Sequence, residues 1–282
     1  MCLVVVAWRA HPRYRLILAA NRDEFHARPA APLGWWAEDR QVLAGRDLQA
    51  SGSWLGLARS GHFCALTNFR EAATPREQAP SRGRLVADYL MRRTAPEGYL
   101  RELRGDRDRY PGFNLLVGNA DSLHYFSNRD EDVPRRLPPG THGLSNHRLG
   151  TPWPKLRRTE EALQQLLTEP ELTSSQLLEL LADRSAADQD ELRDTGLPRE
   201  LERALSAPFV VHPQYGTRCS TAVLVGHDGR AIVHERRFDA DARESGSTRI
   251  EFMTGETVAE IPRRDGASAS TEPATRYDEW PE

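Results

Sequence analysis

The sequence predicts an α+β fold in which two antiparallel or mixed sheets pack against each other and helices lie outside them. Three observations predict it. Most apolar runs are short and separated by turn residues, which is typical of hairpins. Helical patterns come in blocks, and strands do not alternate with helices. The last observation excludes a doubly wound parallel sheet or a barrel of βα units.

Each element follows from a local pattern. Strands are predicted where apolar or β-branched runs are bounded by turn residues, at 2–8, 15–20, 53–58, 62–69, 113–118, 123–126, 208–212, 217–225, 231–238 and 250–253. Helices are predicted where leucines or other apolar residues recur at helical spacing, at 81–91, 96–103, 156–167 and 177–181, with Ser81 as the cap of the first.

The remaining segments are polar. Residues 21–47 contain prolines and glycines, and we expect a loop there with a short strand around Val42. The charged stretch 183–198 predicts a surface insertion. We expect one domain over residues 1–255 and a polar, flexible tail over 256–282, which lacks hydrophobic periodicity.

Composition excludes several classes of protein. The 38 basic and 41 acidic residues of the 282-residue chain give a net charge of −3, and no basic block marks a nucleic-acid surface. The apolar run 2–8 is far shorter than the roughly 18 residues of a transmembrane helix. No positive residue precedes this run and Arg9 ends it early, so a signal peptide is not expected and a cytoplasmic location is.

The three cysteines, Cys2, Cys64 and Cys219, are too few for a disulfide scaffold and form no C-x-x-C pair that would indicate a zinc site. Cys2 becomes the first residue if Met1 is removed, which places a thiol and a free α-amine on one residue. The amine, with an ordinary pKa of about 7.7–8.0, can accept the thiol proton. The alternative is a small apolar residue that opens a core strand.

Asn21-Arg22-Asp23-Glu24 follows the second predicted strand. In a hairpin, the end of the second strand lies beside the start of the first, so Asp23 is expected close to Cys2. A carboxylate there would hold and orient the α-ammonium. The alternative is an ordinary polar loop with an Asx turn.

Together these motifs resemble the NRDE family, whose animal members are called transport and Golgi organisation protein 2. The resemblance spans roughly residues 1–240 and is carried by Met1-Cys2 and by the segments 21–24, 44–47, 52–56, 65–70, 81–83, 143–146 and 151–155. The family is in turn similar to N-terminal nucleophile hydrolases of the penicillin V acylase and bile-salt hydrolase type. This implies a four-layer αββα sandwich.

The resemblance also implies roles for residues. Cys2 resembles the nucleophile and Asp23 the aspartate that orients its amine. Asn68 and Asn146 resemble the two asparagines that form the oxyanion hole and contact the amine and substrate. Such donors matter because negative charge builds on the carbonyl oxygen during attack.

Two arginines of the acylases need counterparts in this chain. Ala20 stands where the acylases have an arginine before the asparagine, so Arg22 replaces that arginine if its side chain turns inward. Arg218, just before Cys219, is the candidate for their late arginine. Trp54 and Lys155, the one lysine of the chain, are candidates for binding the substrate, Lys155 through an anionic group. The alternatives are a core or lid residue for Trp54 and a solvated helix residue for Lys155.

The expected function is therefore cysteine-dependent hydrolysis of a carbon–nitrogen amide other than a peptide bond, with a small-molecule substrate and no metal or cofactor. The alternative is a non-enzymatic carrier of haem or acyl-lipid on the same scaffold, since the family has been linked to both. Histidines near the predicted site are the candidate haem ligands, at 62, 142 and 147, and tryptophans could line an apolar pocket, at 35, 36, 54 and 153.

Overall fold

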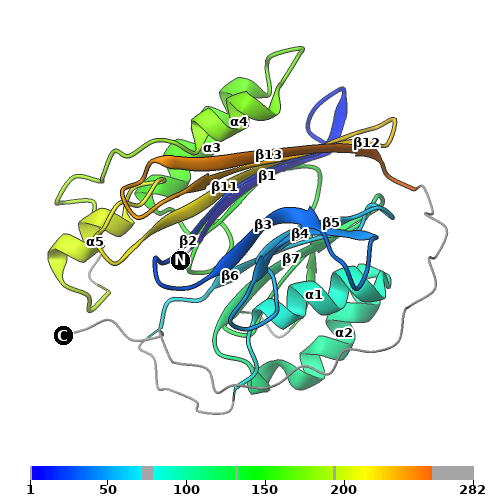
Figure 1. Cartoon of the computed structure of the whole chain (residues 1–282), viewed down its shortest axis with the longest axis horizontal. Helices are drawn as coiled ribbons and strands as arrows, with labels where there is room; N and C mark the ends of the chain where they lie inside the picture. Colours follow the sequence, from blue (N-terminus) through cyan, green and yellow to red (C-terminus); the bar gives the residue numbers. More distant parts are fainter. Residues whose placement is uncertain (1, 72–78, 131–132, 193–194, 256–282) are drawn as a thin grey trace.

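The computed structural model describes residues 2–71, 79–130, 133–192 and 195–255, so the predicted tail lies outside the described residues. Two antiparallel sheets lie face to face, with helices on both outer faces (Figure 1). The expected four-layer αββα sandwich is confirmed. Among the described residues, no helix combines the length and the apolar character needed to cross a bilayer.

The first sheet has the strand order β10-β1-β2-β11-β12-β13. In that order the strands are Gly140–Leu144, Cys2–Trp8, Tyr14–Phe25, Tyr215–Gly226, Arg230–Phe238 and Glu244–Met253. The second sheet runs from β3 to β9 in chain order. Its strands are Ala30–Trp35, Val42–Asp47, Leu55–Ala58, Phe63–Asn68, Phe113–Gly118, Leu123–Ser127 and Arg135–Arg136.

The helices cover the outer faces. α3 and α4 (Pro154–Leu166 and Ser174–Leu180) pack on the first sheet, and α1 and α2 (Gly83–Arg92 and Pro96–Asp106) pack on the second. A 3-10 turn, Arg107–Arg109, follows α2, and α5 (Arg199–Leu205) lies beyond the end of the first sheet (Figure 1).

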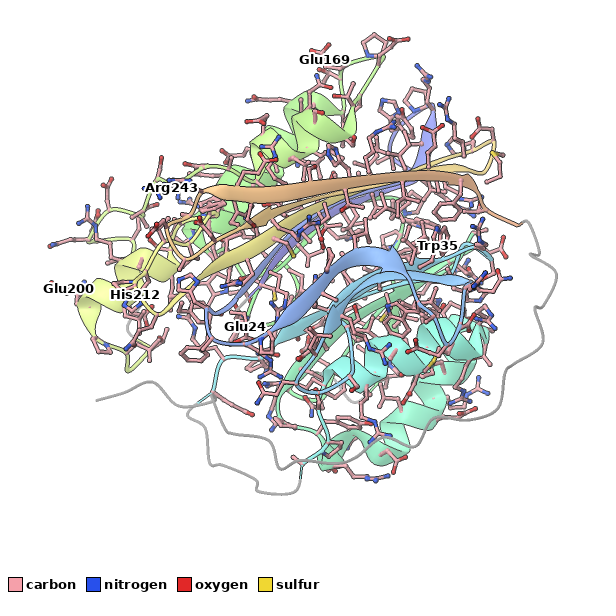
Figure 2. All side chains as sticks on the ribbon, in the orientation of Figure 1. Glu24, Trp35, Glu169, Glu200, His212 and Arg243 are labelled. Atoms are coloured by element: carbon pink, nitrogen blue, oxygen red, sulfur yellow. The ribbon has the colours of Figure 1, made fainter. Side chains whose placement is uncertain are left out.

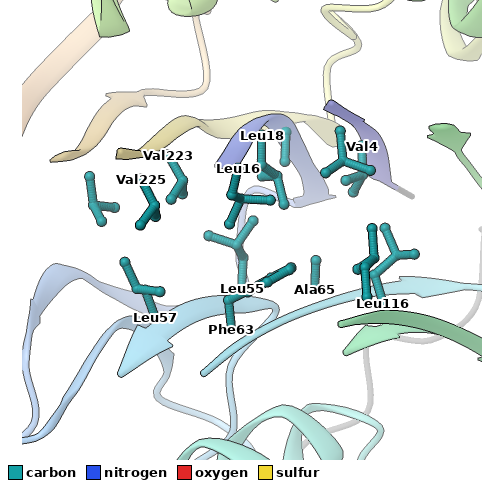
Figure 3. Close-up of a cluster of buried hydrophobic side chains, with 14 of the residues drawn as sticks. Val4, Leu16, Leu18, Leu55, Leu57, Phe63, Ala65, Leu116, Val223 and Val225 are labelled. Atoms are coloured by element: carbon teal, nitrogen blue, oxygen red, sulfur yellow. The ribbon is translucent and has the colours of Figure 1, made fainter. Parts of the chain in front are cut away.

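The core lies between the sheets. Side chains such as Val4, Leu18 and Val223 from the first sheet face Leu55 and Leu116 from the second (Figure 3). The alternate residues of β1 and β2 are buried as well, because α3 and α4 cover them. Burial on both faces explains why β1 is a continuous apolar run rather than an alternating one.

The prediction of a loop over 21–47 is wrong. β2 extends to Phe25, and β3 and β4 occupy most of the remainder. The polar residues at the end of β2 stay in the strand because β1 and β11 pair with them on both sides. The predicted strand 208–212 reduces to one bridge, between Val211 and Gly216.

Sequence patterns also missed several elements and shortened one strand. The 3-10 turn, β9, β10 and α5 were not predicted, and the predicted strand 250–253 is only the end of β13. β13 lies at the sheet edge, where alternating exposed polar residues hide the strand signal.

Two motif glycines, Gly52 and Gly83, meet where the start of α1 touches the segment before β5. A Cβ atom added to Gly52 would lie 2.4 Å from the carbonyl carbon of Gly83, and the Gly83 carbonyl accepts a hydrogen bond from Ser53 N–H at 3.1 Å. We therefore expect Gly52→Ala to destabilise the protein by about 1–3 kcal/mol, measured by urea denaturation. Gly98→Ala, where an added Cβ meets nothing within 4 Å, is the control and should not destabilise it.

Candidate active site

Cys2 lies at the start of β1, at the end of the sandwich where β2 and β6 also end (Figure 1). Its Cα pairs with that of Arg22 on β2, and its carbonyl accepts a hydrogen bond from Ser145 Oγ at 3.0 Å. The backbone of Asp23 is hydrogen-bonded to the Cys2 thiol. Burial raises the pKa of this thiol, so it requires a base to become a nucleophile at neutral pH.

Asp23 is 2% exposed and held on two sides. Thr217 Oγ1 donates to its Oδ1 at 2.7 Å, and the Tyr215 hydroxyl donates to its carbonyl at 2.6 Å. Burial raises the pKa of Asp23, while the nearby charge of Lys155 opposes the rise. Glu24, the residue after Asp23, lies at the end of the molecule where the chain begins (Figure 1 and Figure 2). The hairpin thus brings the predicted carboxylate to the predicted nucleophile.

Lys155 is the second residue of α3, directly after Pro154 at the first helical position. It is 3% exposed, and in the described part of the chain its Nζ has no hydrogen-bond partner. Burial lowers the pKa of Lys155, and Asp23 is the largest opposing influence. An ammonium in this position is costly because the positive end of the helix dipole adds to the loss of solvation.

We therefore expect Lys155→Met to raise the free energy of unfolding by about 1–3 kcal/mol at neutral pH. The folded-state pKa of Lys155 lies below its ordinary value of 10.5, so the unfolded chain holds this proton more tightly. The stability of the wild-type protein should therefore rise as pH increases from the lowered pKa to 10.5, and the advantage of the variant should shrink over that window.

The measurement is urea denaturation between pH 7 and 10.5, with Arg158→Met as the matched control. Arg158 is on the same helix but interacts with Asp183 at 3.8 Å near the surface. A less stable Lys155→Met would mean that the attraction between Lys155 and Asp23 outweighs the cost of desolvation.

Asn68 and Asn146 lie together where the two sheets meet. Asn68 is the last residue of β6, and its carbonyl accepts a hydrogen bond from Asn146 Nδ2 at 2.9 Å. Asn146 follows β10, and Ser145 Oγ donates to its Oδ1 at 3.2 Å. This hydrogen bonding joins the second sheet to the segment beside Cys2.

The structure brings Arg22 to the inner face of the sandwich. Its side chain is 5% exposed and its guanidinium lies 4.3 Å from the centre of the Trp54 ring. Trp54 packs against the core between the sheets. The side chain of Arg22 therefore turns inward, which is the condition under which Arg22 could replace the arginine of the acylases.

Arg218 lies near Arg22: burial lowers the pKa of the Arg218 guanidinium, and the charge of Arg22 adds to the lowering. Arg218 occupies an irregularity in the pairing of β11 with β2, and it donates to the ring and the carbonyl of His26 at 3.0 and 3.2 Å. The three candidate haem ligands each have a polar partner within the protein: His62 with Ser60, His142 with Pro138 and His147 with Thr151.

Beside Cys2 the surface has a hollow with an empty volume of about 360 Å³, including the part open to solvent. Its polar lining residues include Arg70, Ser145, Asn146, Lys155 and Glu202, and Trp153 forms an apolar wall. Cys2 and Asp23 do not line the hollow themselves. Ser145 joins the two places, since it lines the hollow and donates to the Cys2 carbonyl.

Sequence reasoning missed Thr217, Ser145, Arg70 and Glu202. Arg70 and Ser145 lie within the family motifs 65–70 and 143–146, so their position in these motifs could have identified them. Thr217 opens a predicted strand, and Glu202 is in an unpredicted helix. Only the tertiary structure brings these two to the site.

The family model described as Transport and Golgi organisation 2 matches residues 1–240 of this chain. The chain belongs to this family. It is 36% identical over 256 residues to the Transport and Golgi organization protein 2 homolog of Bos taurus, covering 84% of this chain and 92% of that protein. The homolog of Homo sapiens is 34% identical over the same length and with the same coverage. The predicted resemblance is confirmed, and the family's Asn-Arg-Asp-Glu segment is the end of β2.

Two of the solved structures similar to this family member have titles that name a hydrolysing enzyme. A mutant of the conjugated bile acid hydrolase from Clostridium perfringens aligns with a TM-score of 0.49 and 9% identity, covering 89% of this chain and 92% of that chain. The Caenorhabditis elegans ortholog of N-acylethanolamine-hydrolyzing acid amidase aligns with a TM-score of 0.39 and 11% identity, covering 79% and 92%.

Proposed function

We propose that the protein is a cytoplasmic hydrolase that uses Cys2, after removal of Met1, to cleave a carbon–nitrogen amide other than a peptide bond. The observation that carries the proposal is the meeting of Cys2 and Asp23: the Asp23 backbone bonds the thiol, while its carboxylate is buried beside it. Met1 itself lies outside the described residues.

The reaction proceeds in two stages. The α-amine of Cys2 takes the thiol proton, and the thiolate attacks the substrate carbonyl to form a carbon–sulfur bond. The carbon–nitrogen bond then breaks as the α-ammonium returns the proton to the leaving amine. Water hydrolyses the resulting thioester, which releases a carboxylic acid and restores the thiol.

The remaining residues have supporting roles in this proposal. Asp23 holds the α-ammonium, which is why it must keep its charge despite burial. One N–H of the Asn146 side chain donates to Asn68, and we assign its second N–H, together with Asn68, to the oxyanion. Arg22, stacked on Trp54, supplies positive charge beside the Cys2 thiolate.

Intact-mass spectrometry before and after treatment with iodoacetamide tests the proposal. We expect the purified protein to lack Met1 and to gain one adduct, because Cys64 and Cys219 are buried and burial raises the pKa of both thiols. Cys2→Ser should lose the adduct, whereas Cys64→Ser, the matched control, should keep it.

Retention of Met1 would contradict the role of the α-amine, and an unmodified Cys2 would contradict the hydrolase. The carrier alternative makes the opposite prediction. A carrier would bind haem or an acyl-coenzyme A equally well in the wild-type protein and in Cys2→Ala, and neither would hydrolyse an amide.

A further inference from the structure

The hollow beside Cys2 contains an unpartnered buried cation. Lys155 lines it, is 3% exposed, and within the described residues has no hydrogen-bond partner at Nζ. Trp153 and Pro154, which begin α3, line it as well, so the N-terminus of a 13-residue helix opens at the same place. Both features favour a bound anion.

The other charges around the hollow have partners. Arg70 and Glu202 form an ion pair at 3.0 Å, and Glu191 pairs with Arg157 at 2.6 Å. Asp23 attracts Lys155, but the proposed mechanism assigns the Asp23 carboxylate to the α-ammonium of Cys2. Lys155 therefore contributes one positive charge that no acidic group of the described residues balances at hydrogen-bond distance.

We propose that the hollow binds a carboxylate of the substrate, with Lys155 Nζ as the group that recognises it. A single negative charge matches the single unbalanced cation. A dianion such as phosphate fits less well, because the basic groups other than Lys155 at the hollow are already paired with Glu202 and Glu191, and the second negative charge would lack a counterpart. The apolar walls formed by Trp153, Leu192 and Leu205 favour a carboxylate attached to an aliphatic or aromatic group.

The inference deepens the proposed function and rests on it for two claims, that Asp23 serves the α-ammonium of Cys2 and that the bound molecule is a substrate. The hollow is joined to the Cys2 backbone through Ser145, and Asn146 both lines the hollow and bonds the end of β6. A carboxylate held by Lys155 would thus position the rest of an acidic amide towards Cys2.

Lys155 is the one lysine in the sequence, which makes a direct test possible without resonance assignment. In full-length protein labelled with ¹³C-lysine, the side-chain signal reports this residue alone. We expect hexanoate to shift the signal saturably and to raise the pKa of Lys155 by about one unit or more, because an opposite charge stabilises the ammonium. Hexanamide, the neutral analogue, should leave the signal unchanged at the same concentration.

Calorimetry with hexanoate supplies the second measurement. Lys155→Met should weaken hexanoate binding at least tenfold and Lys155→Arg should restore part of it, while Arg158→Met should bind as the wild-type protein does. An unshifted lysine signal, an equal response to hexanamide, or tighter binding of inorganic phosphate than of hexanoate would each overturn the inference.

These binding results do not depend on turnover. If Cys2 proves unreactive while hexanoate still binds at Lys155, the carboxylate site stands and the hydrolase fails. If Cys2 is reactive and hexanoate does not bind, the hydrolase stands and the acidic substrate class is wrong.

Discussion

If the protein is the amide hydrolase that we propose, replacing Asp23 with asparagine is expected to slow that hydrolysis by about 10²–10⁴-fold, the usual range for loss of acid–base catalysis. The amide can still accept the Thr217 hydrogen bond, so the fold should be retained. What is lost is the negative charge to which the proposal assigns the α-ammonium, the group that returns a proton to the leaving amine in the proposed reaction.

The same variant should not slow simple alkylation of Cys2. The Asp23 charge raises the pKa of the thiol, so its removal favours the thiolate and should move the pH profile of iodoacetamide modification to lower pH. The measurement is the rate of amide hydrolysis divided by the rate of Cys2 alkylation, compared between Asp23→Asn and the wild-type protein. Equal slowing of both reactions would indicate a general disruption of the site.

Thr217→Val is the matched control. It removes one hydrogen bond from the Asp23 carboxylate but leaves the charge in place. Because the Thr217 hydroxyl also accepts a hydrogen bond from the buried Val210 N–H at 2.9 Å, we expect a loss of about 2 kcal/mol in stability, but a much smaller effect on hydrolysis than that of Asp23→Asn. If Thr217→Val abolished hydrolysis as completely, the charge of Asp23 would not be the deciding property.

Replacing Asn114 with leucine is expected to destabilise the protein by about 3 kcal/mol, the largest effect on stability that we predict. Asn114 is 0% exposed on β7. Its Nδ2 donates to the His147 carbonyl at 3.0 Å and to Thr67 Oγ1 at 3.1 Å, and its Oδ1 accepts from the Tyr125 hydroxyl at 2.9 Å. Leucine removes the donor to the His147 carbonyl and to Thr67 Oγ1, and it removes the acceptor of the Tyr125 hydroxyl.

Tyr125→Phe separates the network from the packing, because it removes one hydroxyl and keeps the ring. It should cost about 1 kcal/mol in the free energy of unfolding, measured by urea denaturation. A loss as large as that of Asn114→Leu would show that the Tyr125 hydroxyl carries the effect. No loss in Asn114→Leu would mean that the network does not position the segment after β10.

Several features of the fold were predictable from local patterns. The β1–β2 hairpin follows from two apolar runs and a turn, and it is the hairpin that brings Asp23 to Cys2. The helices that begin at Gly83, Pro96 and Pro154 follow from their spacing of leucines and from proline at a first helical position. In these cases the information lies within a few neighbouring residues.

Other features depend on contacts between distant segments. The polar end of β2 is a strand because Thr217, Tyr215 and Ser220, nearly 200 residues later, hydrogen-bond to Asp23 and Asn21. Hydrophobic periodicity does not register a buried polar strand, since the pattern of the sequence there is that of a loop.

The sequence by itself determined the layered α+β architecture, the family, and the closeness of Asp23 to Cys2, because short apolar runs, linked motifs and a tight hairpin are all local. Only the tertiary structure decided that Lys155 Nζ is buried without a hydrogen-bond partner among the described residues, that Arg22 turns inward onto Trp54 while Arg218 bonds His26, and that a hollow opens at the start of α3. The reason is physical: burial and the balance of charge depend on the folded chain, which brings together side chains that are far apart in the sequence.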